Sequence, residues 1–240
     1  MRKSMKYFIV ADVHGFFDEM MEALHRNGYD MANPNHTFVS LGDMFDRGEQ
    51  AWETLEFLSE IPEENRLFVL GNHELLMEEI LGRGCIGYYD WLNGTKSTLY
   101  QLTDAYNEED AIAQLRSNSM WRNYIRSCQF YHEVGDNIFV HAWIPRFDYN
   151  TDWRNATISE WKDAIWVNGM REWQEGNREP GKTIWCGHWH VGYGHVNIHH
   201  ICHDEIDGDA VYTPFRDEGI VAMDACTVVS HIVNCEVIEV

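Results

Sequence analysis

Short, strongly apolar runs alternate with segments in which apolar residues recur at helical spacing. The first three runs are bounded by turn residues, which is typical of buried strands in a parallel sheet. We predict strands over residues 7–11, 37–41 and 66–70. The segments after each run predict helices over 16–26, from Trp52 to about Pro62, and over 74–81. This alternation of strand and helix is typical of βαβ units.

From about residue 93 to residue 127 the pattern becomes helical and polar. We expect an inserted helical region that caps the predicted site, with the acidic stretch 108–110 forming a solvated helix face. Short apolar runs then return and predict a second set of strands, which we expect to be more antiparallel than the first. These runs are residues 130–133, 137–141, 182–186, 219–223 and 228–233.

The pattern as a whole predicts an α/β fold with mixed (α+β) sheets. We expect a two-layered β-sandwich core flanked by helices, with the helical insertion around 93–127. A chain of 240 residues can bury a sizeable core, so we expect one domain over residues 1–240.

Charge narrows the choice of partners. The formal net charge is −21, from 18 Lys and Arg residues against 39 Asp and Glu residues. Such a surface repels phosphodiester backbones and argues against bulk nucleic acid as a partner. A site that handles phosphate must then supply its own positive charge. No apolar stretch is long enough to span a membrane, and the basic start of the chain lacks the apolar core of a signal peptide. Six cysteines without a C-x-x-C pair are expected to be reduced, and we expect a cytoplasmic protein.

Polar residues with metal-ligating side chains follow the predicted strands directly. The carboxyl ends of parallel strands meet at one rim of a sheet, and alternate residues of an extended segment point to one side. These side chains are therefore expected to converge. Carboxylate, imidazole and amide groups together suit divalent manganese, iron or zinc, and the set is too large for one ion, so we expect two ions bridged by a carboxylate. The candidate ligands are Asp12, His14, Asp43, Asn72, His141, His188 and His190.

These residues lie in five motifs that resemble those of the calcineurin-like metallophosphoesterase superfamily. The motifs, in order, are D-x-H-G, G-D-x-x-D-R-G, G-N-H-E, a single H and G-H-x-H, and they span Asp12 to His190. The D-R-G and G-N-H-E forms resemble the PPP branch, which includes serine/threonine phosphatases and symmetrical dinucleoside tetraphosphatases. The resemblance implies a first metal on Asp12, His14, Asp43 and His190. It implies a second metal on Asp43, Asn72, His141 and His188, with Asp43 as the bridge.

Two such ions would lower the pKa of a shared water, and the resulting hydroxide would attack phosphorus in line. Arg47 is the candidate clamp for two phosphate oxygens, because its guanidinium forms paired hydrogen bonds. His73 is the candidate general acid for the leaving oxygen, and Asp46 is placed to orient it. The resemblance implies the same roles.

One departure concerns the second phosphate-binding arginine. Many PPP-type proteins carry a W-x-R segment after the fourth motif, whereas here Asn168 stands where that arginine is expected. Arg171 and Arg146 are the alternative residues for that role. The candidate substrate contacts are therefore Arg47, Asn72, Arg146, Asn168 and Arg171.

The leading interpretation is a metal-dependent phosphatase that hydrolyses phosphate monoesters, including phosphoserine and phosphothreonine on proteins. A dinucleoside tetraphosphate hydrolase and a non-catalytic binding module with this fold are the alternatives, and the charge argues against a nuclease. The histidines of the segment 192–201 and its surroundings suggest a further metal site, but a loop and strand near the rim is the more usual structure. The many tryptophans could stack a nucleobase, although core packing is the more usual role.

Overall fold

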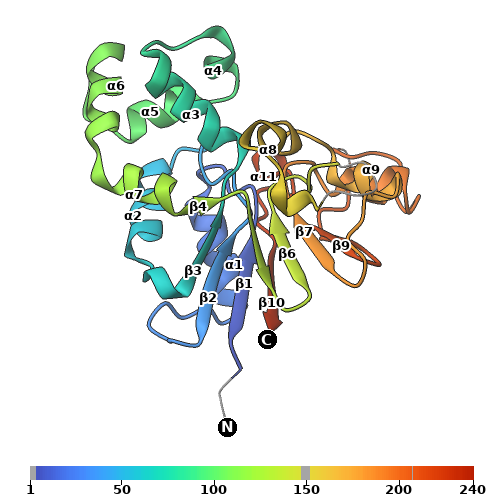
Figure 1. The fold of residues 1–240 in the computed structure, drawn as a ribbon. Helices are drawn as coiled ribbons and strands as arrows, with labels where there is room; N and C mark the ends of the chain where they lie inside the picture. Colours follow the sequence, from blue (N-terminus) through green and yellow to red (C-terminus); the bar gives the residue numbers. More distant parts are fainter. Residues whose placement is uncertain (1–3, 147–151, 207) are drawn as a thin grey trace.

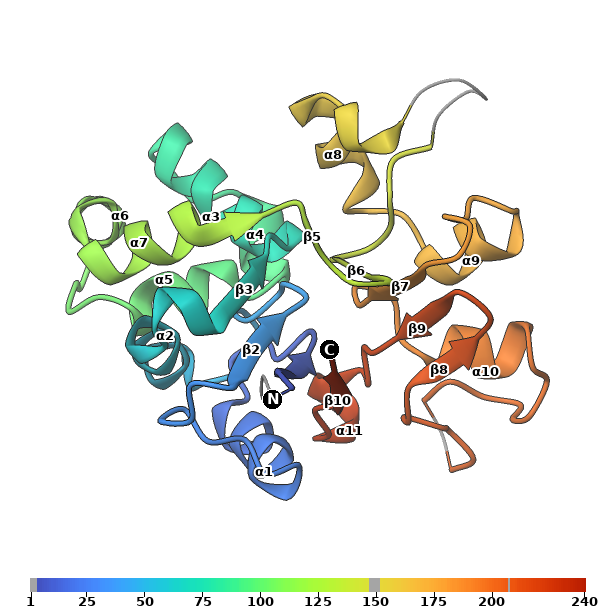
Figure 2. The same cartoon turned by 60° about the horizontal axis from the view of Figure 1, so that its bottom comes forward.

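Two five-stranded mixed sheets face each other in the computed structural model, which describes residues 4–146, 152–206 and 208–240 (Figures 1 and 2). In the first sheet only β10 runs antiparallel to its neighbour β1, and the other pairs are parallel. Its strands, in spatial order, are β10 (Cys235–Glu239), β1 (Lys6–Val10), β2 (His36–Ser40), β3 (Arg66–Val69) and β4 (Cys128–Gln129).

The second sheet has antiparallel pairs at both edges and parallel pairs in its centre. The second half of the chain is therefore more antiparallel than the first, as expected from the sequence. Its strands, in spatial order, are β5 (Tyr131–Val134), β6 (Asn137–Val140), β7 (Thr183–Cys186), β9 (Ile220–Ala222) and β8 (Phe215–Asp217).

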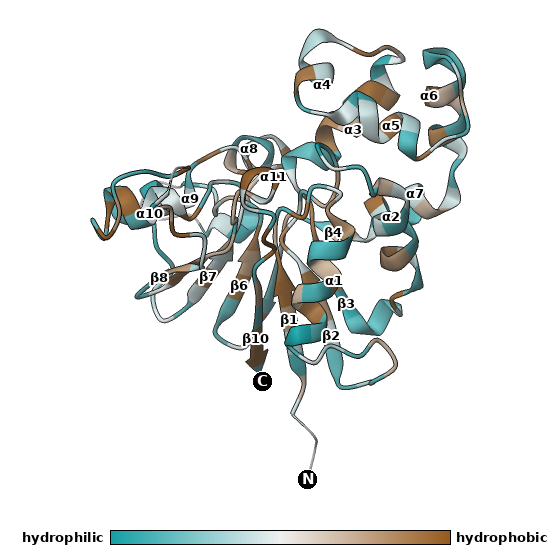
Figure 3. Cartoon of the chain, turned by 180° about the vertical axis from the view of Figure 1, so that it is seen from behind, coloured by the Kyte–Doolittle hydropathy of each residue, from teal (hydrophilic) through white to brown (hydrophobic). Residues whose placement is uncertain are grey.

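Alternation along each strand sends side chains to two different cores. In β1, Phe8 and Val10 pack against helices on the outer face, whereas Ile9 packs into a cluster between the sheets. From the second sheet, Phe139 and Trp185 enter the same inter-sheet cluster. Figure 3 shows the apolar residues of β1 and β10 in brown. The predicted two-layered sandwich is confirmed.

Helices cover the outer faces of both sheets (Figure 2). Beside the first sheet lie α1 (Phe17–Arg26), α2 (Ala51–Glu60), the short helix η1 (Glu63–Asn65) and α3 (Asn72–Arg83). The second sheet is accompanied by η2 (Trp153–Asn155), α8 (Ile158–Ala164), α9 (Gly169–Gln174) and α10 (Gly192–Asn197). The last helix, α11 (Thr227–Ser230), precedes β10.

The predicted helical insertion is present and begins slightly earlier than expected, with α4 (Tyr88–Leu92). It continues as α5 (Thr95–Gln101), α6 (Glu108–Ser117) and α7 (Ser119–Ser127), beside α3 in Figure 1. Its buried residues, including Leu99, Leu115 and Trp121, belong to the same apolar cluster as Phe8 of β1. This region is therefore packed into the core of the first layer. The acidic stretch 108–110 forms the first turn of α6, where negative side chains stabilise the helix.

Two predicted elements were wrong. Residues 228–233 do not form a strand, because Thr227 donates a hydrogen bond to the backbone of Asp12 (3.0 Å) and starts the short helix α11. The strand that follows is β10. The segment 192–201 contains α10 instead of a loop and strand, because Gly194 has no side chain and lets this helix pack directly on the Phe215 ring. The pattern also missed strands β4, β8 and β10, together with helices α8 and α9.

Replacing Phe139, which is fully buried between the sheets, tests the inter-sheet core. We expect Phe139→Ala to lower the free energy of unfolding by about 3–5 kcal/mol, because it leaves a cavity that the two sheets cannot close. Urea denaturation measures the change. Ile158→Ala, at an exposed position of α8, is the control and should have little effect. Equal stabilities for the two variants would contradict this account of the core.

Candidate metal centre

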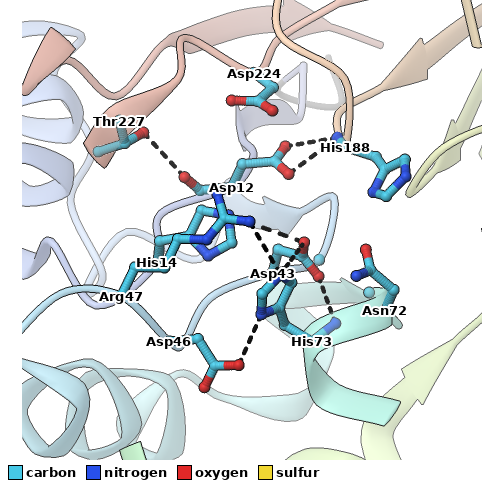
Figure 4. A network of polar contacts seen from close by, with 12 residues as sticks. Asp12, His14, Asp43, Asp46, Arg47, Asn72, His73, His188, Asp224 and Thr227 are labelled. Carbon is cyan, nitrogen blue, oxygen red and sulfur yellow. Dashed lines mark hydrogen bonds and ion pairs between the residues drawn. The ribbon is translucent and has the colours of Figure 1, made fainter. Parts of the chain in front are cut away.

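Most of the predicted metal ligands lie at the carboxyl ends of parallel strands from both sheets, and Figure 4 shows Asp12, Asp43, Asn72 and His188 around a common centre. Asp12 follows β1, Asp43 follows β2, and Asn72 opens α3 after β3. His141 follows β6 and His188 follows β7 in the second sheet. The sandwich therefore brings together side chains that are far apart in the sequence.

The backbone at these strand ends is unusual. Nine non-glycine residues of the described chain have positive φ angles, and six of them are predicted site residues. Such conformations cost free energy and persist where surrounding contacts hold them, often at functional sites. The six are Asp12, His14, Asp43, Asp46, Arg47 and His188.

Asp43 is the centre of the cluster. It forms one group of potential donors with His14 and His73 and a second group with His141 and His188, with the donor atoms of each group within 4.8 Å of one another. One Asp43 oxygen lies 4.0 Å from His14 Nε2 and 3.9 Å from His73 Nε2, and the other lies 3.5 Å from His141 Nε2. Burial alone would raise the pKa of Asp43, but the imidazoles of His141, His73 and His14 hold it below its ordinary value. A carboxylate shared by two donor groups has the arrangement expected of a bridging ligand.

The tautomers of His14 and His141 also favour a metal-binding role for this cluster. His14 Nδ1 lies 2.9 Å from the Phe45 carbonyl, and His141 Nδ1 lies 2.8 Å from the Leu41 carbonyl. Because a carbonyl only accepts, each Nδ1 carries a proton, and in the neutral form of either ring Nε2 has a bare lone pair. Burial lowers the pKa of His14, so its neutral form is favoured. Both lone pairs face the carboxylate of Asp43.

Asn72 places another acceptor in this region. Its Oδ1 lies 2.8 Å from Nε2 of His141. In the neutral tautomer of His141 both atoms are acceptors, so their close approach is unfavourable unless both bind one cation. Burial and the neighbouring His141 lower the pKa of His188 to about 3. Its imidazole is therefore also neutral and can offer a lone pair to a metal ion. The donor set fits borderline divalent metal ions.

Asp12 and Asp224 add buried carboxylates beside this centre. Asp12 accepts hydrogen bonds from the His188 backbone at 2.9 and 3.0 Å, and burial followed by the neighbouring charges of Asp224 and Asp43 raises its pKa. Burial also raises the pKa of Asp224. The sequence analysis missed Asp224, although it follows strand β9 as Asp12 and Asp43 follow theirs. That shared pattern was the signal for it.

His190 lies at the edge of the centre and belongs to neither donor group. Its Nδ1 is 2.8 Å from Glu205, and hydrogen bonding with the Cys226 thiol raises its pKa to about 9. A carboxylate on one ring nitrogen is a common way to orient a metal-binding histidine.

His73 and Arg47 lie beside Asp43 in the same centre. His73 Nδ1 is 2.7 Å from Asp46, and its backbone N–H donates to Asp43 at 2.9 Å. Although burial lowers the pKa of His73, the carboxylates of Asp43 and Asp46 raise it by more. The Arg47 guanidinium lies 3.5 Å from His73 Nε2 and is exposed. These contacts hold a proton donor and a cation together beside the centre.

Helix α5 supports the loop that carries Asp46 and Gly48. The sequence did not predict these contacts. Thr95 donates to Asp46 at 2.6 Å, and the Asp46 backbone donates to Thr98 at 3.0 Å. Gln101 donates to the Gly48 carbonyl at 2.9 Å. Threonine and glutamine in a helix carry no local signal for such contacts, because the contacts depend on tertiary packing.

Glu74 is a second supporting residue that the analysis missed. It accepts hydrogen bonds from the backbones of Asp43, Met44 and Gly71 at 2.9–3.0 Å. Tyr124 of α7 donates to the same carboxylate at 3.2 Å. Glu74 therefore ties the strand end that carries Asp43 to the start of α3.

The three remaining candidate substrate contacts are engaged elsewhere. Asn168 caps α9 by accepting from the Arg171 backbone at 3.1 Å. Arg171 pairs with Glu175 at 3.0 Å, and Arg146 pairs with Glu172 and Glu175 at 3.0 and 2.6 Å. Their roles toward a substrate stay predictions.

The further histidines form no third cluster. Within residues 4–146, 152–206 and 208–240, the groups of three or more potential metal donors are the two that share Asp43. His195 is buried with Nε2 near the Thr213 carbonyl (2.9 Å), and His199 pairs with Asp217 at 3.2 Å.

The chain belongs to the calcineurin-like phosphoesterase family, whose model matches residues 5–192. The chain is 36% identical over 211 residues to the asymmetrical bis(5′-nucleosyl)-tetraphosphatase PrpE of Bacillus subtilis (strain 168), covering 81% of this chain and 80% of that protein. It is 22% identical over 208 residues to the PrpE protein of Halalkalibacterium halodurans, covering 81% of this chain and 79% of that protein.

A solved structure shows the same fold. The crystal structure of a protein provisionally named a diadenosine tetraphosphatase superposes with a TM-score of 0.59 at 13% identity, covering 100% of this chain and 94% of the other. The resemblance read from the motifs is confirmed, and the protein is an enzyme that hydrolyses phosphoester bonds. The family uses a pair of divalent metal ions, and the donor set around Asp43 fits such a pair. None of the described helices has both the length and the apolar character required to cross a membrane.

Gly71 tests how tightly the centre is packed. A Cβ atom at Gly71 would collide with the Asp43 carboxylate and lie 2.5 Å from Glu74. We expect Gly71→Ala to lower the free energy of unfolding by about 1–3 kcal/mol. Gly82→Ala is the matched control in α3, since nothing lies within 4 Å of its added methyl group, and it should be neutral or stabilising by up to about 1 kcal/mol. Urea denaturation of both variants separates steric collision from a general effect of alanine.

Proposed function

We propose that this enzyme is a dinuclear-metal hydrolase of dinucleoside tetraphosphates. The observation that carries the metal-dependent part is the convergence of bare imidazole nitrogens on the shared carboxylate Asp43. The substrate class is supported by the 36% identity to an asymmetrical bis(5′-nucleosyl)-tetraphosphatase over four-fifths of both chains. The sequence motifs alone favour phosphate monoesters, with dinucleoside tetraphosphates as the alternative. Phosphoserine and phosphothreonine in proteins are therefore the second candidate.

The metal assignment follows the motifs. Manganese is the expected metal, with iron and zinc as alternatives. Bound divalent ions would lower the pKa of a water molecule and neutralise charge on phosphate oxygens. We assign Asp12, His14, Asp43 and His190 to one ion and Asp43, Asn72, His141 and His188 to the other.

The other residues of the centre have distinct roles in this proposal. Arg47 holds phosphate oxygens, because its guanidinium is exposed beside the cluster and can form paired hydrogen bonds. His73 gives a proton to the leaving oxygen from Nε2, while Asp46 accepts from Nδ1 and fixes the ring. The raised pKa of His73 favours the protonated imidazole that this role needs.

The surface charge of −21 fits a small anionic substrate held by local positive charge and not a long nucleic acid. We keep the expectation of a cytoplasmic location and of one domain over residues 1–240 as part of this proposal.

Asp43→Asn tests the shared ligand. We expect this variant to lose both ions and at least about a hundredfold of the activity, because an amide is a weak bridging ligand. The measurement is metal content after manganese loading and gel filtration, together with kcat/KM. Asp136→Asn, at an exposed position, is the control and should retain both ions. Full metal content in Asp43→Asn would contradict the bridging role.

His73→Asn separates proton transfer from metal binding. We expect kcat to fall by about 10²–10⁴ with little change in metal content, because the general acid is removed and the assigned ligands remain. His73 also lies beside His14 and Asp43, so loss of an ion from this variant would instead make it a ligand. His25→Asn, exposed on α1, should behave as wild type.

A substrate comparison decides between the two candidates. We expect the manganese-loaded enzyme to cleave a dinucleoside tetraphosphate with kcat/KM at least about tenfold above that for a phosphoserine or phosphothreonine peptide panel. An aryl phosphate serves as the generic reference. Chromatography of the nucleotide products shows which phosphate bond is cut. A preference for the phosphopeptides would replace the proposed substrate with the second candidate.

A further inference from the structure

A cavity lies beside helix α3, between the helical insertion and the segment after α8. Its volume is about 430 Å³. Leu76 of α3 lines it one helical turn after Asn72, and Trp166 lines it from the other side. Tyr88 and Tyr89 of α4 complete the wall. In Figure 1, α3, α4 and α8 all lie at the end of the molecule where the strands of both sheets deliver the site residues.

Trp166 connects this cavity to the centre. Its ring lies perpendicular to that of His188, with 5.9 Å between the ring centroids. The backbone of Trp166 also forms a hydrogen bond with the His188 imidazole. A molecule that fills the cavity against Trp166 therefore contacts a side chain that itself contacts an assigned metal ligand.

The aromatic side chains of the cavity are unusually exposed. The exposed fractions are 69% for Tyr88, 73% for Tyr89 and 48% for Trp166. Aromatic side chains normally bury much of their surface in a core or an interface, and these three surround one hollow. Flat faces around a cavity of this size favour a planar ring as the occupant.

The charge of the cavity excludes a phosphate group. Glu79 and Asp90 line it, and its one lining cation, Arg83, is paired with Asp90 at 2.5 Å. Anionic groups are repelled here, whereas an uncharged ring with exocyclic N–H donors can bind to carboxylate and amide oxygens. Asn93 adds such an amide. The phosphates of a nucleotide would lie at the centre, near Arg47, and the base would lie in the cavity.

We propose that Tyr88, Tyr89 and Trp166 form a nucleobase-binding site that holds one base of a nucleoside polyphosphate while its phosphate chain lies over the metal centre. This inference rests on the proposed function and adds the element that selects nucleotides over other phosphates. Stacking on aromatic side chains tolerates different bases, so the site selects a nucleoside more strongly than it selects a particular base.

Equilibrium binding tests the cavity without any reaction. Isothermal titration calorimetry of the manganese-loaded enzyme compares adenosine monophosphate with ribose 5-phosphate, which lacks the base. We expect wild type to bind adenosine monophosphate at least about tenfold more tightly. The ratio should approach one in Trp166→Ala and in the double variant Tyr88→Ala/Tyr89→Ala. Trp166→Ala keeps the backbone group that bonds to His188, and metal content is measured for each variant.

Tyr106→Ala is the matched control, because Tyr106 belongs to the same helical insertion, is 100% exposed and lies outside the cavity. It should keep the wild-type ratio. A wild-type ratio near one, or an unchanged ratio in both cavity variants, would overturn the proposal.

Hydrolysis assays distinguish a failure of the base site from a failure of the proposed function. We expect the double variant Tyr88→Ala/Tyr89→Ala, which leaves Trp166 against His188, to lose about tenfold or more of kcat/KM for a dinucleoside tetraphosphate while keeping its rate on inorganic tripolyphosphate. If wild type discriminates for the base in binding but does not cleave dinucleoside tetraphosphates, the base site stands and the proposed substrate fails. If it cleaves them and the double variant does so equally well, the proposed substrate stands and the base site fails.

Discussion

The structure depends on keeping a carboxylate ionised in the interior of the protein. Asp43 is buried, and imidazoles from both sheets hold its pKa below the ordinary value. A buried charge without such partners would be strongly unfavourable. The alignment of strand ends, the left-handed turns and the backbone hydrogen bonds to Glu74 all serve to hold these groups at their mutual distances. Residues from both sheets of the sandwich are therefore needed around Asp43.

The parts of the fold that sequence could predict are those in which one local pattern admits one structure. Strands β1, β2 and β3 were found to within a residue, because each is an apolar run that stops at turn residues. The run 228–233 has the same composition, but side-chain hydrogen bonds from Thr227 convert its start into a helix. Runs this short are decided by their tertiary contacts.

The residues of the site also divide into those that a local sequence pattern predicts and those that it does not. Residues that follow a strand could be located from the chain alone, and Asp224 obeys this rule although it was overlooked. Thr95, Thr98 and Tyr124 could not be located, because their positions in helices reveal neither which face packs inward nor which loop they reach. The expected phosphate-binding arginines illustrate a further limit. Arg146 and Arg171 are close in sequence to the motifs, yet carboxylates of α9 and of the residue after it already engage them.

Helices α5 and α4 of the helical insertion are held by different contacts. Helix α5 is bonded to the loop that carries Asp46 and Gly48, so changes in its polar face disturb the groups around His73. Helix α4 exposes its aromatic rings, and its buried Asp90 pairs with Arg83 of α3, away from this loop. Substitutions of the exposed rings of α4 can therefore reshape the proposed base site while the hydrogen bonds that hold the Asp46–Gly48 loop stay in place.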